Sequence, residues 1–141
     1  MDETPLAQMK RGKLKLDIQI IDHIVLTVID IKKTCNFYSE VLGMEKIKFG
    51  NNRKALKFNN QKINLHEYGD EFEPKADIST PGSVDICFIT STPLIEAIDH
   101  ITSMGVDIID GPVERAGANG KVNSIYFKDP DGNLIELSNY K

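Results

Sequence analysis

Residues 126–137 read YFKDPDGNLIEL, and this stretch predicts two β-strands joined by a tight turn. In the central Asp-Pro-Asp-Gly-Asn segment, Pro130 fixes φ, Gly132 accepts a positive φ, and the Asp and Asn side chains can bond nearby backbone. Apolar residues on both sides complete the pattern of a hairpin. In the second strand, Ile135 and Leu137 share one face and Glu136 points to the other. Glu136 is therefore either a solvated strand residue or a functional carboxylate on a surface that no helix covers.

Working outward from this hairpin, the same order of elements occurs twice in the chain. The apolar patterns predict βαβββ in residues 19–68, a polar linker in residues 69–82, and βαβββ again in residues 83–139. The register supports a repeat, since Gly43 follows His23 by 20 residues and Gly105 follows Asp85 by 20 residues. An internal repeat of this kind indicates two similar units around one core.

Several local features are expected from this pattern. Asp30 should cap the first helix, and Ser91 or Thr92 the second. The second helix should lead into a short strand at residues 106–109, followed by a long glycine-rich loop at residues 111–120 that carries Arg115. Residues 1–17 show no sustained apolar period and are expected to form a flexible N-terminal tail, which leaves residues 18–141 as a single domain.

The predicted fold class is therefore α+β, with two paired βαβββ modules that form a curved, open-barrel-like mixed sheet around a central cleft, the helices lying outside. Four strands with one helix leave one sheet face uncovered, so each module needs a partner. The uncovered faces are expected to line the cleft and to present His23, Asn64, Asp85 and Glu136, with His66 two residues along from Asn64.

Imidazole and carboxylate groups that converge from separate strands are a common way to hold a divalent transition metal. His23 and Glu136 are the main candidate ligands, and His66 and Asp85 are further candidates. Each has an ordinary alternative, such as a hydrogen-bonded histidine or a rim residue for His66 and a paired carboxylate for Asp85. Tyr126 is expected to reach the cleft with its hydroxyl, and Arg115 either binds an anionic substrate group or is simply exposed.

Size and charge exclude several other classes of protein. With 141 residues and a formal net charge of −4, the chain has no basic surface that would favour nucleic acid. No apolar run approaches the roughly 20 residues that a membrane helix needs. The N-terminus lacks a secretory signal, and Cys35 and Cys87 lack a CxxC spacing, so both are expected to be buried reduced thiols in a cytoplasmic protein.

Three segments also resemble a known family. They are DHIVLTV at residues 22–28, FYSEVLGM at residues 37–44 and DPDGNLIEL at residues 129–137, and they are similar to the vicinal oxygen chelate superfamily of glyoxalases, bleomycin-resistance proteins and dioxygenases. The middle segments RKALKF, KINLHE and FEPKA look closer still to the group called glyoxalase domain-containing protein 5.

The resemblance implies paired βαβββ modules around a metal cleft, with ligands at His23, Asn64, Asp85 and Glu136. His23 and Glu136 match the residue types of the family, whereas Asn64 replaces a Glu or Gln and Asp85 replaces a His. The expected function is a lyase, isomerase or dioxygenase that uses Zn, Ni, Mn or Fe on a small oxygen-chelating substrate, with Glu136 as the catalytic residue, Asn64 binding substrate and glutathione as a candidate co-substrate. The alternative is a metal-free small-molecule-binding protein, and a homodimer is compatible with either.

Overall fold

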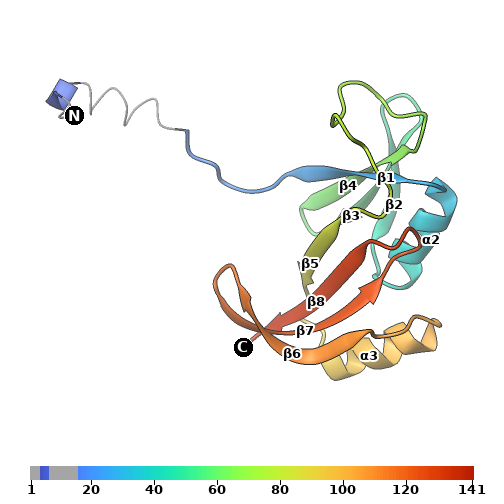
Figure 1. The fold of residues 1–141 in the computed structure, drawn as a ribbon, viewed down its shortest axis with the longest axis vertical. Coiled ribbons are helices and arrows are strands. Elements are labelled where there is room, and N and C mark those ends of the chain that lie inside the picture. Colours follow the sequence, from blue (N-terminus) through green and yellow to red (C-terminus); the bar gives the residue numbers. More distant parts are fainter. Residues whose placement is uncertain (1–3, 7–15) are drawn as a thin grey trace.

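The computed structural model describes residues 4–6 and 16–141 of the chain. The predicted tail at residues 1–17 therefore lies largely outside the described residues. Residues 16–22 carry no helix or strand and run toward the first strand (Figure 1).

The first module is a four-stranded sheet with one helix. Its sheet has the order β1-β4-β3-β2, in which β1 and β4 are parallel and the other neighbouring strands are antiparallel. Asp30 caps the helix as predicted, because its Oδ1 accepts a hydrogen bond from the Lys33 backbone N–H at 3.1 Å. In chain order the elements are β1 (His23–Val28), α2 (Ile31–Glu40), β2 (Glu45–Phe49), β3 (Arg53–Phe58) and β4 (Gln61–Glu67).

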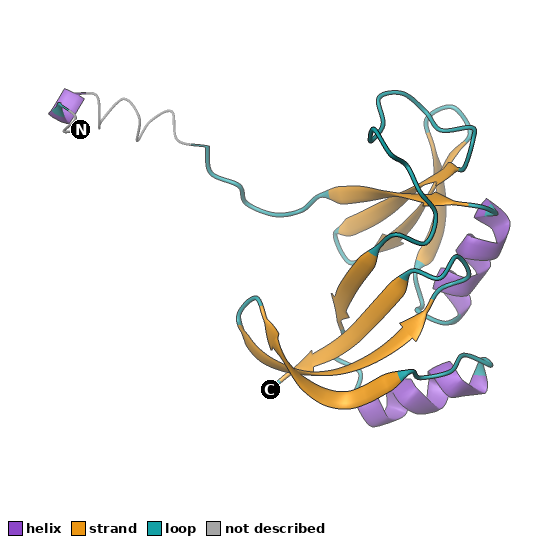
Figure 2. Ribbon diagram, viewed as in Figure 1, coloured by secondary structure: helices purple, strands orange, loops and turns teal. Residues whose placement is uncertain are grey.

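The second module repeats this topology, with the order β5-β8-β7-β6 and a parallel pair formed by β5 and β8. The predicted βαβββ repeat is thus confirmed, as two separate mixed sheets that do not close into a barrel (Figure 2). In each module, the first strand is an edge strand. The elements are β5 (Asp85–Ile89), α3 (Leu94–Ser103), β6 (Asp110–Gly117), β7 (Gly120–Lys128) and β8 (Leu134–Tyr140).

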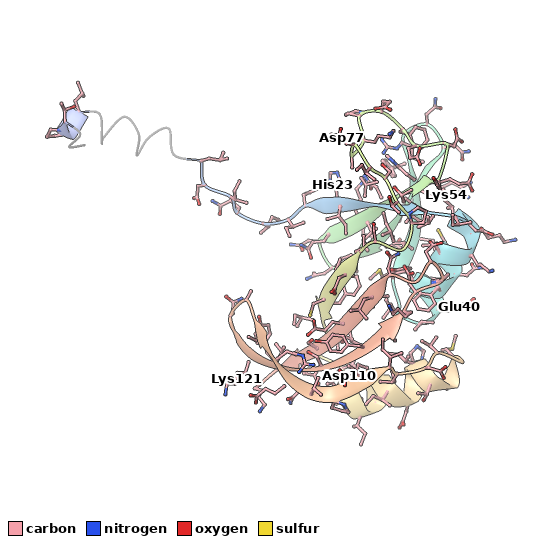
Figure 3. All side chains as sticks on the ribbon, in the orientation of Figure 1. His23, Glu40, Lys54, Asp77, Asp110 and Lys121 are labelled. Atoms are coloured by element: carbon pink, nitrogen blue, oxygen red, sulfur yellow. The ribbon has the colours of Figure 1, made fainter. Side chains whose placement is uncertain are left out.

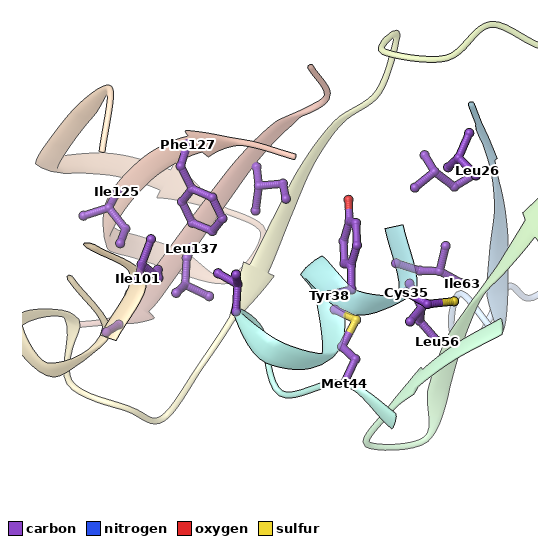
Figure 4. Close-up of a cluster of buried hydrophobic side chains, with 14 of the residues drawn as sticks. Leu26, Cys35, Tyr38, Met44, Leu56, Ile63, Ile101, Ile125, Phe127 and Leu137 are labelled. Atoms are coloured by element: carbon purple, nitrogen blue, oxygen red, sulfur yellow. The ribbon is translucent and has the colours of Figure 1, made fainter. Parts of the chain in front are cut away.

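One hydrophobic core joins the helix-covered faces of the two modules. Figure 4 shows Tyr38 and Met44 between the side chains of the first sheet and those of the second. The ring of Phe37 lies 6.5 Å from that of Phe127 on β7, and His100 of α3 contacts the backbone carbonyl of Val41 at 3.0 Å. Because helix α2 packs against both halves, the modules fold as one unit, and their other faces stay free of helices.

The Asp-Pro-Asp-Gly-Asn turn also holds the two modules together, through the buried carboxylate of Asp129. Asp129 accepts hydrogen bonds from the backbone N–H groups of Asp131 and Asn133, both at 2.9 Å, and from Asn133 Nδ2 at 2.8 Å. The Tyr38 hydroxyl on α2 donates to the same carboxylate at 2.7 Å. Burial and the nearby Asp129 charge both raise the pKa of Tyr38, so this phenol stays a donor. The predicted turn is therefore also the link between α2 and the second module.

Three local predictions for the second module were wrong, and they concern a loop, a strand and the cap of the second helix by Ser91 or Thr92. The expected loop at residues 111–120 is mostly strand β6, and the expected strand at residues 106–109 is not one. Pro112 and the glycines suggested a loop, but β6 is an edge strand with a register shift between Asp110 and Val113, and such a strand tolerates proline. The second helix begins after Pro93 with no side-chain cap of its own, and Asn139 Oδ1 on β8 accepts from the Leu94 N–H at 3.0 Å instead.

Among the described residues, no helix has the length and apolar character that crossing a bilayer would require.

Candidate functional site

The carboxylate of Glu136 lies half-buried on the face of β8 opposite the core, as the sequence predicted. Ser124 on β7 donates a hydrogen bond from its Oγ to Glu136 Oε2 at 2.6 Å, and the Ser138 hydroxyl lies 3.4 Å from the same oxygen. Both serines are fully buried, so they fix the direction of the carboxylate. The serine hydroxyls contact Oε2, and the Tyr126 hydroxyl and the Cys87 thiol also interact with this carboxylate.

Tyr126 and Arg115 lie beside Glu136 on the same face of the sheet. Tyr126 is the direct neighbour of Glu136 across the β7–β8 ladder. Arg115 on β6 donates from Nε to the Tyr126 hydroxyl at 3.1 Å, and its guanidinium lies 5.6 Å from the centre of that ring. Burial raises the pKa of Tyr126, so its hydroxyl remains protonated at neutral pH and can donate to a ligand oxygen. The structure therefore groups three of the predicted site residues on the second module.

Cys87 is exposed on β5, so the prediction of a buried thiol was wrong for this cysteine and is confirmed for Cys35. The error arises because β5 is an edge strand whose outer face no helix covers. Cys87 is the neighbour of Glu136 in the β5–β8 ladder, and its Sγ lies 3.3 Å from Ser138 Oγ. Desolvation and the Glu136 charge raise the pKa of this thiol, which argues against a nucleophilic role. Asp85 is exposed at the start of the same strand.

His23 lies at the start of β1 in the first module (Figure 3), and 44% of its side chain is exposed. Its Nδ1 lies 2.7 Å from Asp22 Oδ2, so a carboxylate orients the imidazole. His23 and Cys87 line a common cavity of about 180 Å³. The role of His23 as a metal ligand, which the sequence predicts, stays a prediction.

Asn64 and His66 lie deep on the uncovered face of the first sheet, with 5% and 2% of their surfaces exposed. His66 Nε2 lies 3.4 Å from Arg53 Nη2. Burial and the Arg53 charge lower the pKa of His66, so the ring is neutral at neutral pH. A guanidinium at this distance disfavours a second cation, and the surroundings of His66 therefore argue against the predicted role as a metal ligand.

Within the part of one chain that the structure describes, no three His, Cys, Asp or Glu side chains converge as a metal site requires. The candidate ligands are split between the modules, with His23, Asn64 and His66 on the first sheet and Asp85 and Glu136 on the second. Sequence reasoning missed Ser124 and Arg53, which contact two of the predicted residues. Ser124 could have been found from the hairpin register, since it shares a strand face with Tyr126.

Comparison with known proteins gives a consistent family assignment. Residues 20–137 match the model of the Glyoxalase/Bleomycin resistance protein/Dioxygenase superfamily. The chain is 57% identical over 127 residues to virulence protein STM3117 of Salmonella typhimurium, a match that covers 90% of this chain and 88% of that protein. The crystal structure of STM3117 superposes with a TM-score of 0.88 and covers 89% of this chain and 100% of the other.

Two further relatives have names that state a domain or an activity. The glyoxalase domain-containing protein RDO1 of Mycosarcoma maydis is 48% identical, and the match covers 94% of this chain and 74% of that protein. A solved structure of the fosfomycin resistance protein FosX of Listeria monocytogenes, complexed with Mn(II) and a dihydroxypropylphosphonic acid, is 29% identical with a TM-score of 0.60. That match covers 86% of this chain and 90% of the other.

Proposed function

Because the chain belongs to the Glyoxalase/Bleomycin resistance protein/Dioxygenase superfamily, we propose that it is an enzyme acting on a small molecule with adjacent oxygen atoms. The side chains fit best with a lyase or isomerase reaction that removes a proton from the carbon atom next to a carbonyl group. The relatives include a metallothiol transferase and a probable lactoylglutathione lyase, at 28% and 29% identity.

The observation that supports this proposal is the environment of Glu136. The carboxylate is half-buried on a face without helix cover, has one oxygen fixed by Ser124, and takes part in no ion pair among the described residues. A structural carboxylate at such a position is normally neutralised by a partner. Glu136 is instead oriented by a serine hydroxyl and has no cationic partner among the described residues, which suits a general base or a metal ligand.

In this proposal, the side chains around Glu136 bind and orient the substrate. The Tyr126 hydroxyl, held by Arg115, donates a hydrogen bond to a substrate oxygen. Arg115 is itself paired with Asp110, at 3.6 Å between Nη2 and Oδ2, so its part is to position the phenol. Glu136 takes a proton from the neighbouring carbon, while Ser124 keeps the carboxylate aligned. Asn64 would supply a further polar contact from the first module.

A metal centre needs donors that residues 4–6 and 16–141 of a single chain do not bring together. We propose that a second copy of the chain completes it, with His23 from one copy and Glu136 from the other. The edge strands β1 and β5 carry His23 and Asp85 and leave one backbone edge of each sheet unpaired. Their outer faces also expose Val25 and Ile89, at 44% and 53%. A divalent metal held there would polarise the substrate oxygen.

A metal-free binding protein is the second candidate function. It is favoured by Asn64 and Asp85, which stand where the family usually has a Glu or Gln and a His, and by the lack of three converging ligands among the residues that the structure describes. The same uncovered faces would then hold a small molecule without reacting with it.

Metal loading with an activity assay separates the two candidates. Purified protein is loaded with Zn, Ni, Mn or Fe, desalted, and analysed for bound metal. Turnover is then measured with methylglyoxal plus glutathione, beside catechol ring-cleavage substrates. We expect about one metal per chain and turnover that chelators abolish. Protein that retains none of the four metals, and shows no turnover, would contradict the enzymatic proposal and leave the binding function.

A further inference from the structure

An apolar arm precedes the first strand and leaves the body of the chain. Residues 16–21 read LDIQII and carry no helix or strand. The side chains of Leu16, Ile18 and Ile20 are 79%, 73% and 62% exposed, and Ile21 is 66% exposed. The arm runs away from both modules (Figure 1). Apolar side chains exposed in succession on one segment are typical of a surface that another molecule covers.

The arm has the side-chain pattern of a strand but no strand beside it. In residues 16–20, apolar and polar side chains alternate, so an extended backbone gives the arm one apolar face. A lone strand is not stable in water and needs a neighbouring strand or a packed surface. Gln61 Nε2 on β4 donates to the Ile21 carbonyl at 2.6 Å, which fixes the end of the arm that leads into β1. The apolar face beyond this anchor is free to pack elsewhere.

A groove of about 710 Å³ between the two modules offers a surface of matching character. It lies between the end of α2, the β3–β4 turn, β5 and α3, and its apolar walls include Leu42, Phe58, Phe88 and Ile89. Ile89 is more than half exposed, so part of this wall is uncovered. The groove adjoins the base of the arm, because it shares Phe58 and Phe88 with the cavity of about 180 Å³ that Ile21 lines.

The charges of the arm and the groove are also complementary. Residues 10–15, which lead into the arm, read KRGKLK and include four basic side chains. The groove is lined by Glu96 on α3, and Glu40 precedes the groove residue Val41. Both glutamates are exposed, and neither takes part in an ion pair among residues 4–6 and 16–141. An arm that enters the groove therefore brings basic residues toward an acidic rim.

We propose that residues 16–21 pack into the groove of a second copy of the chain, so that two copies exchange their arms around a twofold axis. The groove of the arm's own chain lies at the base of the arm, and the arm points away from it. Residues 16–22 contain no Gly or Pro that would favour a reversal of the chain. Six extended residues span about 20 Å, enough to reach into a neighbouring copy. The inference goes beyond the proposed function, because it needs neither a metal nor a substrate.

Cross-linking to Cys87 tests where the arm packs. Cys87 is exposed and lines the groove, whereas Cys35 is buried. Full-length chains that carry Ile18→Cys or Ile20→Cys are treated at low concentration with a short bismaleimide, without metal, and separated on a denaturing gel. We expect a covalent dimer with at least one of them, and its loss when Cys87→Ser is added. Ile78→Cys, at a linker position that is 85% exposed, is the matched control and should stay monomeric on the gel.

Three results of this cross-linking would overturn the exchange. The first is no cross-link with either variant. The second is a cross-link within one chain, identified by mass spectrometry, which would mean that the arm folds onto its own groove. The third is a dimer that persists with Cys87→Ser, which would mean that the arms contact each other outside the groove.

Self-association measured by sedimentation velocity gives an independent result on the uncross-linked protein. Ile18→Asp combined with Ile20→Asp should weaken dimerisation about tenfold or more, because an apolar groove disfavours carboxylates. Both positions are exposed, so the variant should fold normally, which circular dichroism verifies. Ile78→Asp should dimerise as the wild type does. A wild type that stays monomeric, or a double variant that dimerises unchanged, would contradict the arm exchange without bearing on the activity of Glu136.

Discussion

Replacing Glu136 by Gln should lower kcat/KM by about 10²–10⁴-fold, the usual contribution of a positioned general acid or base. The amide keeps the shape of the side chain and its bond with Ser124, but it can neither accept a proton nor bind a cation strongly. The change is measured with whichever substrate the assay identifies. Because Glu136 is half-buried without an ion partner, the variant is expected to fold as the wild type does.

Two further variants show whether this loss comes from the position of the carboxylate. Ser124→Ala removes the 2.6 Å hydrogen bond that orients Glu136, and it should lower kcat more than it raises KM while keeping part of the activity. Glu114→Gln changes an exposed carboxylate that pairs with Lys121 and Lys141, and it should leave the kinetics unchanged. If Glu136→Gln retained full activity, the assignment of Glu136 would be wrong.

Asp129→Ala should lower the free energy of unfolding by about 3–5 kcal/mol, which is large for a single substitution. The substitution removes the acceptor of four hydrogen bonds and leaves buried donors on the turn and on α2 unpaired. Urea unfolding, followed by circular dichroism, measures the change. Both modules depend on this carboxylate, so a single cooperative transition should move to lower urea concentration.

The Tyr38→Phe variant isolates the link to α2. It removes only the 2.7 Å bond between the phenol and Asp129, and the expected loss is about 1–3 kcal/mol, as for a buried bond to a charged acceptor. Tyr68→Phe changes a tyrosine that is more than half exposed and should have almost no effect. Equal stabilities for Tyr38→Phe and Tyr68→Phe would show that the turn does not join the modules in this way.

The repeated module could be predicted from the sequence because each half has the same spacing of strand, helix and glycine. The alternation around Ile135 and Leu137 also predicted that Glu136 lies on the face opposite the core, because successive side chains of a strand point to opposite faces. The β6 strand was missed because Pro112 and the glycines are typical of loops, and only the position of β6 at the sheet edge makes them tolerable in a strand.

The contacts of the site were less predictable than the faces of its strands. Periodicity gives the direction of a side chain, but it does not show which distant residue lies beside it. Arg53 and His66 are 13 residues apart and meet because β3 and β4 are antiparallel neighbours. The sequence predicts for Asp129 only hydrogen bonds within its own turn, whereas its contact with Tyr38 spans 91 residues. The split of the candidate ligands between two sheets likewise appears only in the structure.

The most direct test of the account is the metal content of a heterodimer made from two inactive chains. His23→Ala and Glu136→Ala chains with different affinity tags are co-expressed, and the dimer carrying both tags is isolated and loaded with metal. If one copy supplies His23 and the other Glu136, one of the two sites in this dimer is intact, and it should bind about half the metal of the wild-type dimer. Each variant alone should bind almost none. A mixed dimer that binds no more metal than either variant would contradict a site shared between two copies.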